Sequence, residues 1–118
     1  PQQAAALIEL LVPRIPIEEI AVHFHDTYGQ ALANVYACMQ LGVSVVDSSI
    51  AGLGGCPYAK GAAGNLATED LLYMLDGLGI ETGVSMERIL EATDFISGVL
   101  GRPPASKTGQ ALLKKREG

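Results

Sequence analysis

Two histidines, one cysteine and one asparagine have the side-chain types and spacing best suited to chemistry in this sequence. His23 and His25 lie in the stretch IAVHFH at 20–25, whose alternation predicts a strand with two different faces. Side chains two residues apart on a strand point to the same side, with Cα atoms ~6.6 Å apart, so both imidazoles can bind one ion. The pair therefore indicates a metal site, although two hydrogen-bonded histidines facing an interior would have the same spacing.

Cys56 lies within the glycine-rich stretch VSVVDSSIAGLGGCPYAKGAAGN at 43–65. Glycines this dense form neither a stable helix nor a stable strand, so we expect a long loop that leaves the carboxyl end of a strand. A thiol on such a loop is accessible, whereas most free cysteines are small buried core residues. From the residues alone, a catalytic role and a structural role for Cys56 both stay open.

Asn65 ends the glycine-rich stretch and could provide a third, oxygen ligand, or could simply start the helix that follows. Asp26, next to His25, could orient a metal-binding histidine through a hydrogen bond or could cap a turn. Two imidazoles and one amide oxygen suit a divalent ion such as Mg²⁺, Mn²⁺ or Zn²⁺. Three ligands leave the coordination shell of the ion incomplete, so water, substrate or a residue from outside this chain must complete it.

The elements that must position these residues follow from hydrophobic periodicity and from helix start and stop signals. A strand, a helix and a second strand with short connections predict a βαβ unit with parallel strands. Functional side chains are then expected at the carboxyl ends of the strands. The predicted ranges are a helix at 4–12, a strand at 20–25, a helix at 30–41, a strand at 43–47, and helices at 68–78 and 86–100.

Other positions in these elements are assigned to packing and to helix ends. Phe24 should point to the face opposite the two histidines, and Cys38, inside the helix at 30–41, should carry a shielded thiol. Ser85 is expected to cap the last of these helices, and Gly101 to end it. Two cysteines so placed do not form a disulfide framework, which favours a reducing, cytosol-like compartment.

The composition indicates one globular domain over residues 1–118, because 48% of the residues are hydrophobic and 18% are charged. The net charge is -5 at pH 7: residues 1–101 hold 3 basic and 12 acidic side chains (-9), and residues 102–118 hold 5 basic and 1 acidic (+4). An acidic body argues against nucleic-acid binding. We interpret 102–118 as a polar, basic and weakly helical tail in solvent. No apolar run reaches the ~18 residues that a membrane span needs.

The stretches HFHDTYGQALAN at 23–34 and DSSIAGLGGCPYAKGAAGNLATEDLLYML at 47–75 resemble the hydroxymethylglutaryl-CoA lyase family. These enzymes are metal-dependent TIM-barrel lyases of the group that also contains the isopropylmalate and homocitrate synthases. The His-x-His pair is shared across that group, whereas the run GLGGCPYA is more selective for the lyases. The resemblance extends from about Ala4 to about Lys107, which is nearly the whole chain.

The resemblance implies a function and a set of site residues. It places a divalent metal, Mg²⁺ or Mn²⁺, on His23, His25 and Asn65, and it makes Cys56 and His23 the catalytic residues. The implied reaction cleaves 3-hydroxy-3-methylglutaryl-CoA to acetyl-CoA and acetoacetate in leucine degradation and ketone-body formation. It also implies an acyl-CoA substrate, a homodimer in the complete enzyme, and a place in the cytoplasm or, in a eukaryote, in the mitochondrial matrix.

The length of the chain sets it apart from this family. A TIM barrel needs ~250 residues and eight strands, so the resemblance implies the C-terminal part of a lyase: the last two parallel strands, their helices and the C-terminal helices. The family's first strand, with an arginine and a metal-binding aspartate, is absent. We therefore expect little activity from the chain alone and exposed apolar strand edges and helix faces. Two alternatives stay open: a truncated, non-catalytic paralogue, and a condensing enzyme of the isopropylmalate synthase type.

Overall fold

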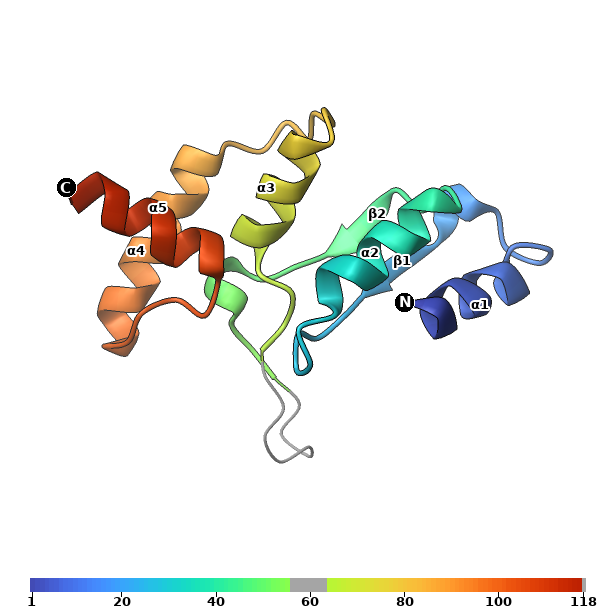
Figure 1. Ribbon diagram of the computed structural model, residues 1–118, viewed down its shortest axis with the longest axis horizontal. Coiled ribbons are helices and arrows are strands. Elements are labelled where there is room, and N and C mark those ends of the chain that lie inside the picture. The colour runs from blue at the N-terminus through green and yellow to red at the C-terminus, as the bar shows by residue number, and fades with distance from the viewer. Residues whose placement is uncertain (56–63, 118) are drawn as a thin grey trace.

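The computed structural model describes residues 1–55 and 64–117, and within them a two-stranded sheet and five α-helices. One group of elements contains both strands, α1 and α2, and the other contains α3, α4 and α5, with the C-terminus in the second group and the N-terminus in the first (Figure 1). The bounds are α1 Gln2–Leu11, β1 Ala21–His23, α2 Ala31–Gln40, β2 Val45–Asp47, α3 Thr68–Gly77, α4 Met86–Leu100 and α5 Lys107–Glu117, with short 3₁₀ turns at Ile17–Glu19 and Ile50–Gly52.

The two strands form the predicted parallel βαβ unit, with α2 as the crossover helix. Ala21 pairs with Val45, and His23 pairs with Asp47 at the carboxyl ends. Each strand has 3 residues and is shorter than predicted. The reason is that the chain beyond each strand bonds to the segment at 64–68: the Leu66 nitrogen donates to the Phe24 carbonyl at 3.1 Å. This segment therefore crosses the ends of both strands.

The core confirms the packing assignments made from the sequence. Val22 is buried, while its neighbours Ala21 and His23 are exposed, because β1 has one apolar face against the helices. Phe24 packs against both buried clusters, and Cys38 has no exposed surface. The buried members of the two clusters are Ile8, Ile20, Val22, Cys38 and Val43 in the first and Ala31, Val35, Leu66 and Leu71 in the second.

The ends of α4 are also those that the sequence predicted. The Ser85 hydroxyl accepts a hydrogen bond from the Arg88 nitrogen at 3.3 Å, which satisfies one of the free N–H groups of the first turn. Gly101 ends the helix with φ 67°, a left-handed conformation that glycine adopts without steric penalty.

The C-terminal segment differs from the predicted solvated tail. Residues Lys107–Glu117 form the helix α5, which lies against α3 and α4 (Figure 1). The Asp70 carboxylate accepts a hydrogen bond from the Thr108 nitrogen at 2.9 Å, so a side chain of α3 caps the first turn of α5. The basic residues lie in the last turn, where their positive charges interact favourably with the negative end of the helix dipole.

Several apolar side chains are exposed on the surface, as expected for part of a larger barrel. Leu10 of α1 and Phe95 of α4 are both 72% exposed, and Val45 on β2 is 45% exposed. Such side chains on helix faces and a strand edge are suited to contact with further protein. Within the described part of the chain, no helix has the length and hydropathy needed to cross a bilayer.

Candidate metal centre

His23 and His25 lie on one side of the carboxyl end of β1, as the alternation predicted. Their ring centroids are 5.4 Å apart, and the rings are tilted by 45°. His25 follows the last residue of β1 by two positions and is held by a backbone bridge to Asn65. The structure thus brings the two predicted imidazoles and the predicted amide together at the end of the strand.

The side-chain amide of Asn65 is oriented by hydrogen bonding. Its Nδ2 atom donates to the Leu53 carbonyl oxygen at 3.0 Å, so its Oδ1 atom points the other way. That oxygen lies 3.0 Å from Nε2 of His23. Because a carbonyl oxygen only accepts hydrogen bonds, the contact with Leu53 fixes which end of the amide faces the histidine.

Glycines allow the two arms of the glycine-rich segment to approach each other around Asn65. A Cβ on Gly54, where φ is 90°, would lie 2.6 Å from Nδ2 of Asn65. A Cβ on Gly64 would lie 1.7 Å from the carbonyl oxygen of Gly52, which no side chain can tolerate. These glycines are therefore required for close packing as well as for the backbone freedom that their density suggested.

Asp47 is a site residue that sequence reasoning missed. Its Oδ2 atom lies 3.2 Å from Nδ1 of His23, and both side chains are exposed by more than half. The available signal was that Asp47 ends the second strand of a predicted parallel pair, whereas its pairing with His23 comes from the register of the strands in the structure. Asp26, considered above as a partner for a histidine, accepts a hydrogen bond from the Ala31 nitrogen at the start of α2.

Glu69 is a second missed residue, and it lies beneath the glycine-rich segment. Its side chain is fully buried, and both of its oxygens accept from the Ala51 nitrogen at 3.0 Å. The Ser106 hydroxyl donates to Oε2 at 2.5 Å. Ala51 has φ 61°, which is unusual for a residue with a side chain. The carboxylate therefore joins the start of α3, the segment before α5 and a strained turn.

Two donor atoms of the site have a spacing that fits one cation. Two ligands at about 2.1 Å and at right angles around an octahedral ion lie about 3.0 Å apart. His23 Nε2 and Asn65 Oδ1 have this separation, so both could serve one ion. Among residues 1–55 and 64–117, no three His, Cys, Asp or Glu side chains form a metal-binding group. An ion bound here would therefore depend on the amide oxygen and on ligands from elsewhere.

Of the two cysteines, the structure describes Cys38. Cys56 lies outside the described residues, and its catalytic role stays a prediction. Cys38 is buried in α2, and burial raises the pKa of its thiol above the ordinary value of 9.0. Since the thiolate is the reactive form, the buried Cys38 is not suited to act as a nucleophile.

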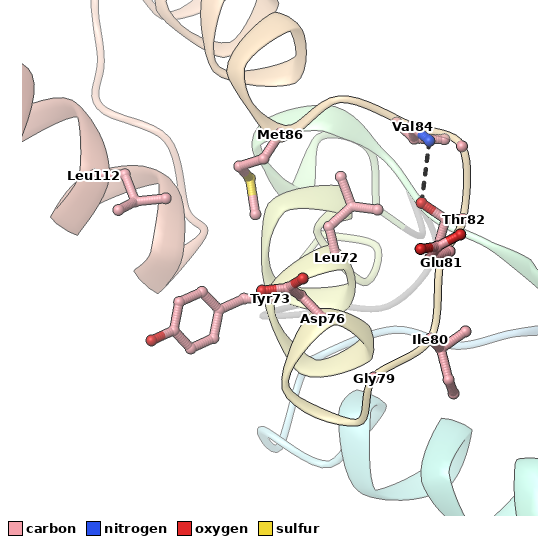
Figure 2. A pocket seen from close by; sticks show the side chains of 11 residues that line it. Leu72, Tyr73, Asp76, Gly79, Ile80, Glu81, Thr82, Val84, Met86 and Leu112 are labelled. Carbon is pink, nitrogen blue, oxygen red and sulfur yellow. Dashed lines mark hydrogen bonds between the residues drawn. The ribbon is translucent and has the colours of Figure 1, made fainter.

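Two of the hollows along α3, α4 and α5 differ in their relation to the candidate metal centre. The larger, of about 720 Å³, is bounded by Leu72, Tyr73 and Asp76 of α3, by the connection to α4, and by Leu112 (Figure 2). It contains neither the histidines nor Asn65, so it is separate from the candidate metal centre. The smaller, of about 330 Å³, adjoins that centre, because the glycine-rich segment forms one of its walls.

Two features of the smaller hollow are polar. Arg102 contributes to its wall, together with the segment that leads to α5. Ser97 also lines it, and its hydroxyl is buried without a hydrogen-bond partner among the residues that the structure describes. A buried hydroxyl without a partner is unusual.

The sequence was compared with known families and curated proteins. A family model described as HMGL-like matches residues 1–96. The mitochondrial hydroxymethylglutaryl-CoA lyase of Mus musculus is 61% identical over 108 residues, which are 92% of this chain and 33% of the mouse protein. The cytoplasmic 3-hydroxy-3-methylglutaryl-CoA lyase of Rattus norvegicus is 52% identical over 116 residues, 98% of this chain and 34% of the rat protein. The chain thus spans about a third of the length of these relatives.

The fold was compared with solved structures. The crystal structure of hydroxymethylglutaryl-CoA lyase from Pseudomonas aeruginosa matches with a TM-score of 0.92 and 54% identity, over 97% of this chain and 38% of that chain. The lyase from Acinetobacter baumannii in complex with coenzyme A and 3-methylmalate matches with a TM-score of 0.89 and 34% identity, over 94% and 36%.

The solved lyases are TIM barrels, so the described strands and helices form part of such a barrel, as predicted. The comparisons do not bear out the C-terminal position within the relatives that the resemblance implied. Because the HMGL-like model matches residues 1–96, which are most of this chain, the chain belongs to the HMGL-like family.

Proposed function

We propose that this chain supplies the metal-binding and thiol-bearing part of a lyase that cleaves 3-hydroxy-3-methylglutaryl-CoA into acetyl-CoA and acetoacetate. The observation that carries the proposal is the convergence of His23 Nε2 and Asn65 Oδ1, 3.0 Å apart, at the carboxyl ends of two parallel barrel strands. Active sites of TIM barrels lie at this end. The relatives named above are hydroxymethylglutaryl-CoA lyases, which supports the same chemistry for this chain.

The residues of the chain have distinct roles in this proposal. His23, His25 and Asn65 hold a divalent cation, Mg²⁺ or Mn²⁺, which when bound supplies Lewis-acid polarisation of the substrate oxygens. The reaction removes the proton of the tertiary hydroxyl, breaks the adjacent carbon–carbon bond and adds a proton to the thioester enolate. As a ligand of the cation that would polarise the hydroxyl, His23 assists the removal of its proton, and Cys56 donates the proton to the enolate carbon.

The acyl-CoA substrate is proposed from the hollow beside the metal centre. Its wall combines the glycine-rich segment with Arg102, whose guanidinium suits the phosphates of coenzyme A, and with Ser97. The relative from Acinetobacter baumannii was solved with coenzyme A, which supports this class of ligand. The reaction belongs to leucine degradation and ketone-body formation.

The setting of the protein is proposed from the same resemblance. The complete enzyme is a homodimer in this proposal, with no nucleic-acid or membrane partner. Its relatives include a mitochondrial and a cytoplasmic lyase, so we place it in the cytoplasm or, in a eukaryote, in the mitochondrial matrix.

A chimera tests the proposal because the chain spans only part of its relatives. The matching segment of the Pseudomonas aeruginosa lyase, 38% of that protein, is replaced by residues 1–118. We expect the purified chimera to form acetoacetate from 3-hydroxy-3-methylglutaryl-CoA in the presence of Mg²⁺. The same chimera with His23→Ala is the matched control and is expected to lose most of this activity, while the isolated chain is expected to show little or none.

The outcomes separate the alternatives. A chimera that has the circular dichroism and oligomeric state of the parent lyase but releases no acetoacetate would make the chain a non-catalytic paralogue. When acetyl-CoA and a 2-oxo acid are supplied as substrates, mass spectrometry of the products detects condensation. A chimera that condenses these compounds and does not cleave the lyase substrate would identify a synthase.

A further inference from the structure

We propose that Asp47 is the positioning residue of the metal centre: its carboxylate holds the proton of His23 on Nδ1, so that the lone pair on Nε2 faces the cation. The inference rests on the proposed metal-binding function, which assigns His23, His25 and Asn65 as ligands and gives no role to Asp47. It starts from the contact of Asp47 Oδ2 with His23 Nδ1 at 3.2 Å.

The register of the sheet brings the two residues together. Asp47 ends β2, and its Cα atom is paired with that of His23 at the end of β1. In a parallel pair, side chains at the same register position lie on the same face. The contact therefore depends on the backbone of two hydrogen-bonded strands and not on a loop.

His23 lies between two oxygens that only accept hydrogen bonds. The Asp47 carboxylate faces Nδ1, and Asn65 Oδ1 faces Nε2 because the Asn65 nitrogen is bonded to the Leu53 carbonyl. A neutral imidazole has one proton for these two positions. A carboxylate is the stronger acceptor, so the proton belongs on Nδ1. Two lone pairs, one on Nε2 and one on Oδ1, are then left 3.0 Å apart, and a cation between them relieves their repulsion.

His25 provides a contrast within the same site. In the part of the chain that the structure describes, His23 has a carboxylate partner, whereas the ring of His25 contacts the ring of His23. A carboxylate behind a ligating histidine fixes its tautomer and raises its basicity. His23 is therefore the oriented ligand of the pair, and His25 is expected to be insensitive to changes at Asp47.

Nitrogen NMR on the ¹⁵N-labelled, metal-free chain tests the position of the proton. The chain has 2 histidines, so the two-bond correlations of their ring nitrogens are easily assigned with the His25→Ala variant. In mildly alkaline buffer, where imidazole is neutral, we expect His23 to carry its proton on Nδ1. Asp47→Ala should abolish this preference and leave the His25 signals unchanged. Asp47→Asn, whose amide oxygen can still accept, should restore it in part.

A second measurement tests the consequence for the metal. Mn²⁺ is titrated into the chimera described above, and the free ion is followed by electron paramagnetic resonance. Asp47→Ala should weaken binding ~10- to 100-fold, as is usual when the partner of a metal-binding histidine is lost. Asp76→Ala, which removes an exposed carboxylate of α3, is the matched control and should leave binding unchanged.

An unchanged His23 tautomer in Asp47→Ala would overturn the inference, as would a lost preference with unchanged Mn²⁺ affinity. If the alanine variant does not fold, the asparagine variant decides by the same two measurements, because it keeps the size of the side chain. Failure of the unsubstituted chimera to bind Mn²⁺ would contradict the proposed function. The tautomer of His23 would still show whether Asp47 orients it, so the two failures are distinguishable.

Discussion

Both side-chain oxygens of Glu69 lie 3.0 Å from the backbone nitrogen of Ala51. Ala51 has a left-handed backbone conformation at the beginning of the glycine-rich segment, and a conformation of this kind persists only where the surrounding structure over-determines it. The Ser106 hydroxyl binds the same carboxylate from the segment before α5. The turn that leads to Asn65 and the C-terminal helix are thus stabilised by one buried acid.

Replacement of Glu69 should therefore be strongly destabilising. Glu69→Ala leaves the Ala51 N–H and the Ser106 hydroxyl buried without their acceptor, and we expect the free energy of unfolding to fall by about 2 to 4 kcal/mol. Urea denaturation followed by circular dichroism measures this change. Glu91→Ala, at an exposed position of α4, is the control and should change stability by less than about 0.5 kcal/mol. Equal effects of the two substitutions would argue against a structural role for the buried acid.

Glycine substitutions should have opposite effects at two positions. Gly54→Ala forces a side chain into a left-handed conformation and into contact with the Asn65 amide, so we expect a loss of about 1 to 2 kcal/mol and weaker metal binding. Gly98→Ala, inside α4 with open space around it, should stabilise the chain by about 0.5 to 1 kcal/mol. Urea denaturation compares the two variants. A tolerated alanine at position 54 would mean that the segment around Asn65 is packed differently.

The positions of the proposed histidine ligands were predictable because they depend on local rules. Alternation in a strand places His23 and His25 on one face, and the end of a barrel strand is where functional side chains collect. The βαβ unit and the cap at Ser85 follow from patterns that span only a few residues.

The missed features depend on contacts between residues far apart in the sequence. Asp47 meets His23 only through the register of two strands, and Glu69 meets Ser106 across 37 positions. The tail was predicted to be solvated because its own residues are polar. Its helix is stabilised by Asp70 of α3, a partner that no local pattern in the tail reveals.

The stability of the chain should decrease in alkaline solution because of Cys38. Burial raises the pKa of its thiol in the folded state, and unfolding returns it to about 9.0. Below that value both states keep the proton, and this thiol contributes no pH dependence. Above it the unfolded chain loses the proton first, so the free energy of unfolding falls by up to ~1.4 kcal/mol per pH unit until the folded-state pKa is reached.

The contribution of Cys38 is measured by difference. Urea denaturation at several pH values from about 8 to 10 is compared between the unsubstituted chain and Cys38→Ala, since tyrosines and lysines titrate in both. The alanine variant should show the shallower decline. Parallel curves would mean that the thiol is not shielded in the folded chain.

Cys56 and Cys38 should react differently with alkylating reagents. In the chimera, iodoacetamide should modify Cys56 first and abolish cleavage, and bound substrate should slow the modification, while the buried Cys38 stays unmodified. Cys56→Ala should lower kcat ~10²- to 10⁴-fold, as for the loss of a general acid, with nearly unchanged Mn²⁺ affinity. Peptide mass spectrometry and steady-state kinetics follow these effects. An alanine variant with the parental kcat would remove Cys56 from the mechanism.

The most direct test of the metal centre is the Mn²⁺ affinity of the chimera with each proposed ligand replaced in turn. His23→Ala, His25→Ala and Asn65→Ala should each weaken binding more than the ~10- to 100-fold expected for the loss of an outer partner. Circular dichroism should show that the fold is kept, because all three side chains lie at strand ends outside the buried clusters. Mn²⁺ affinity that is unchanged in all three variants would contradict the metal centre.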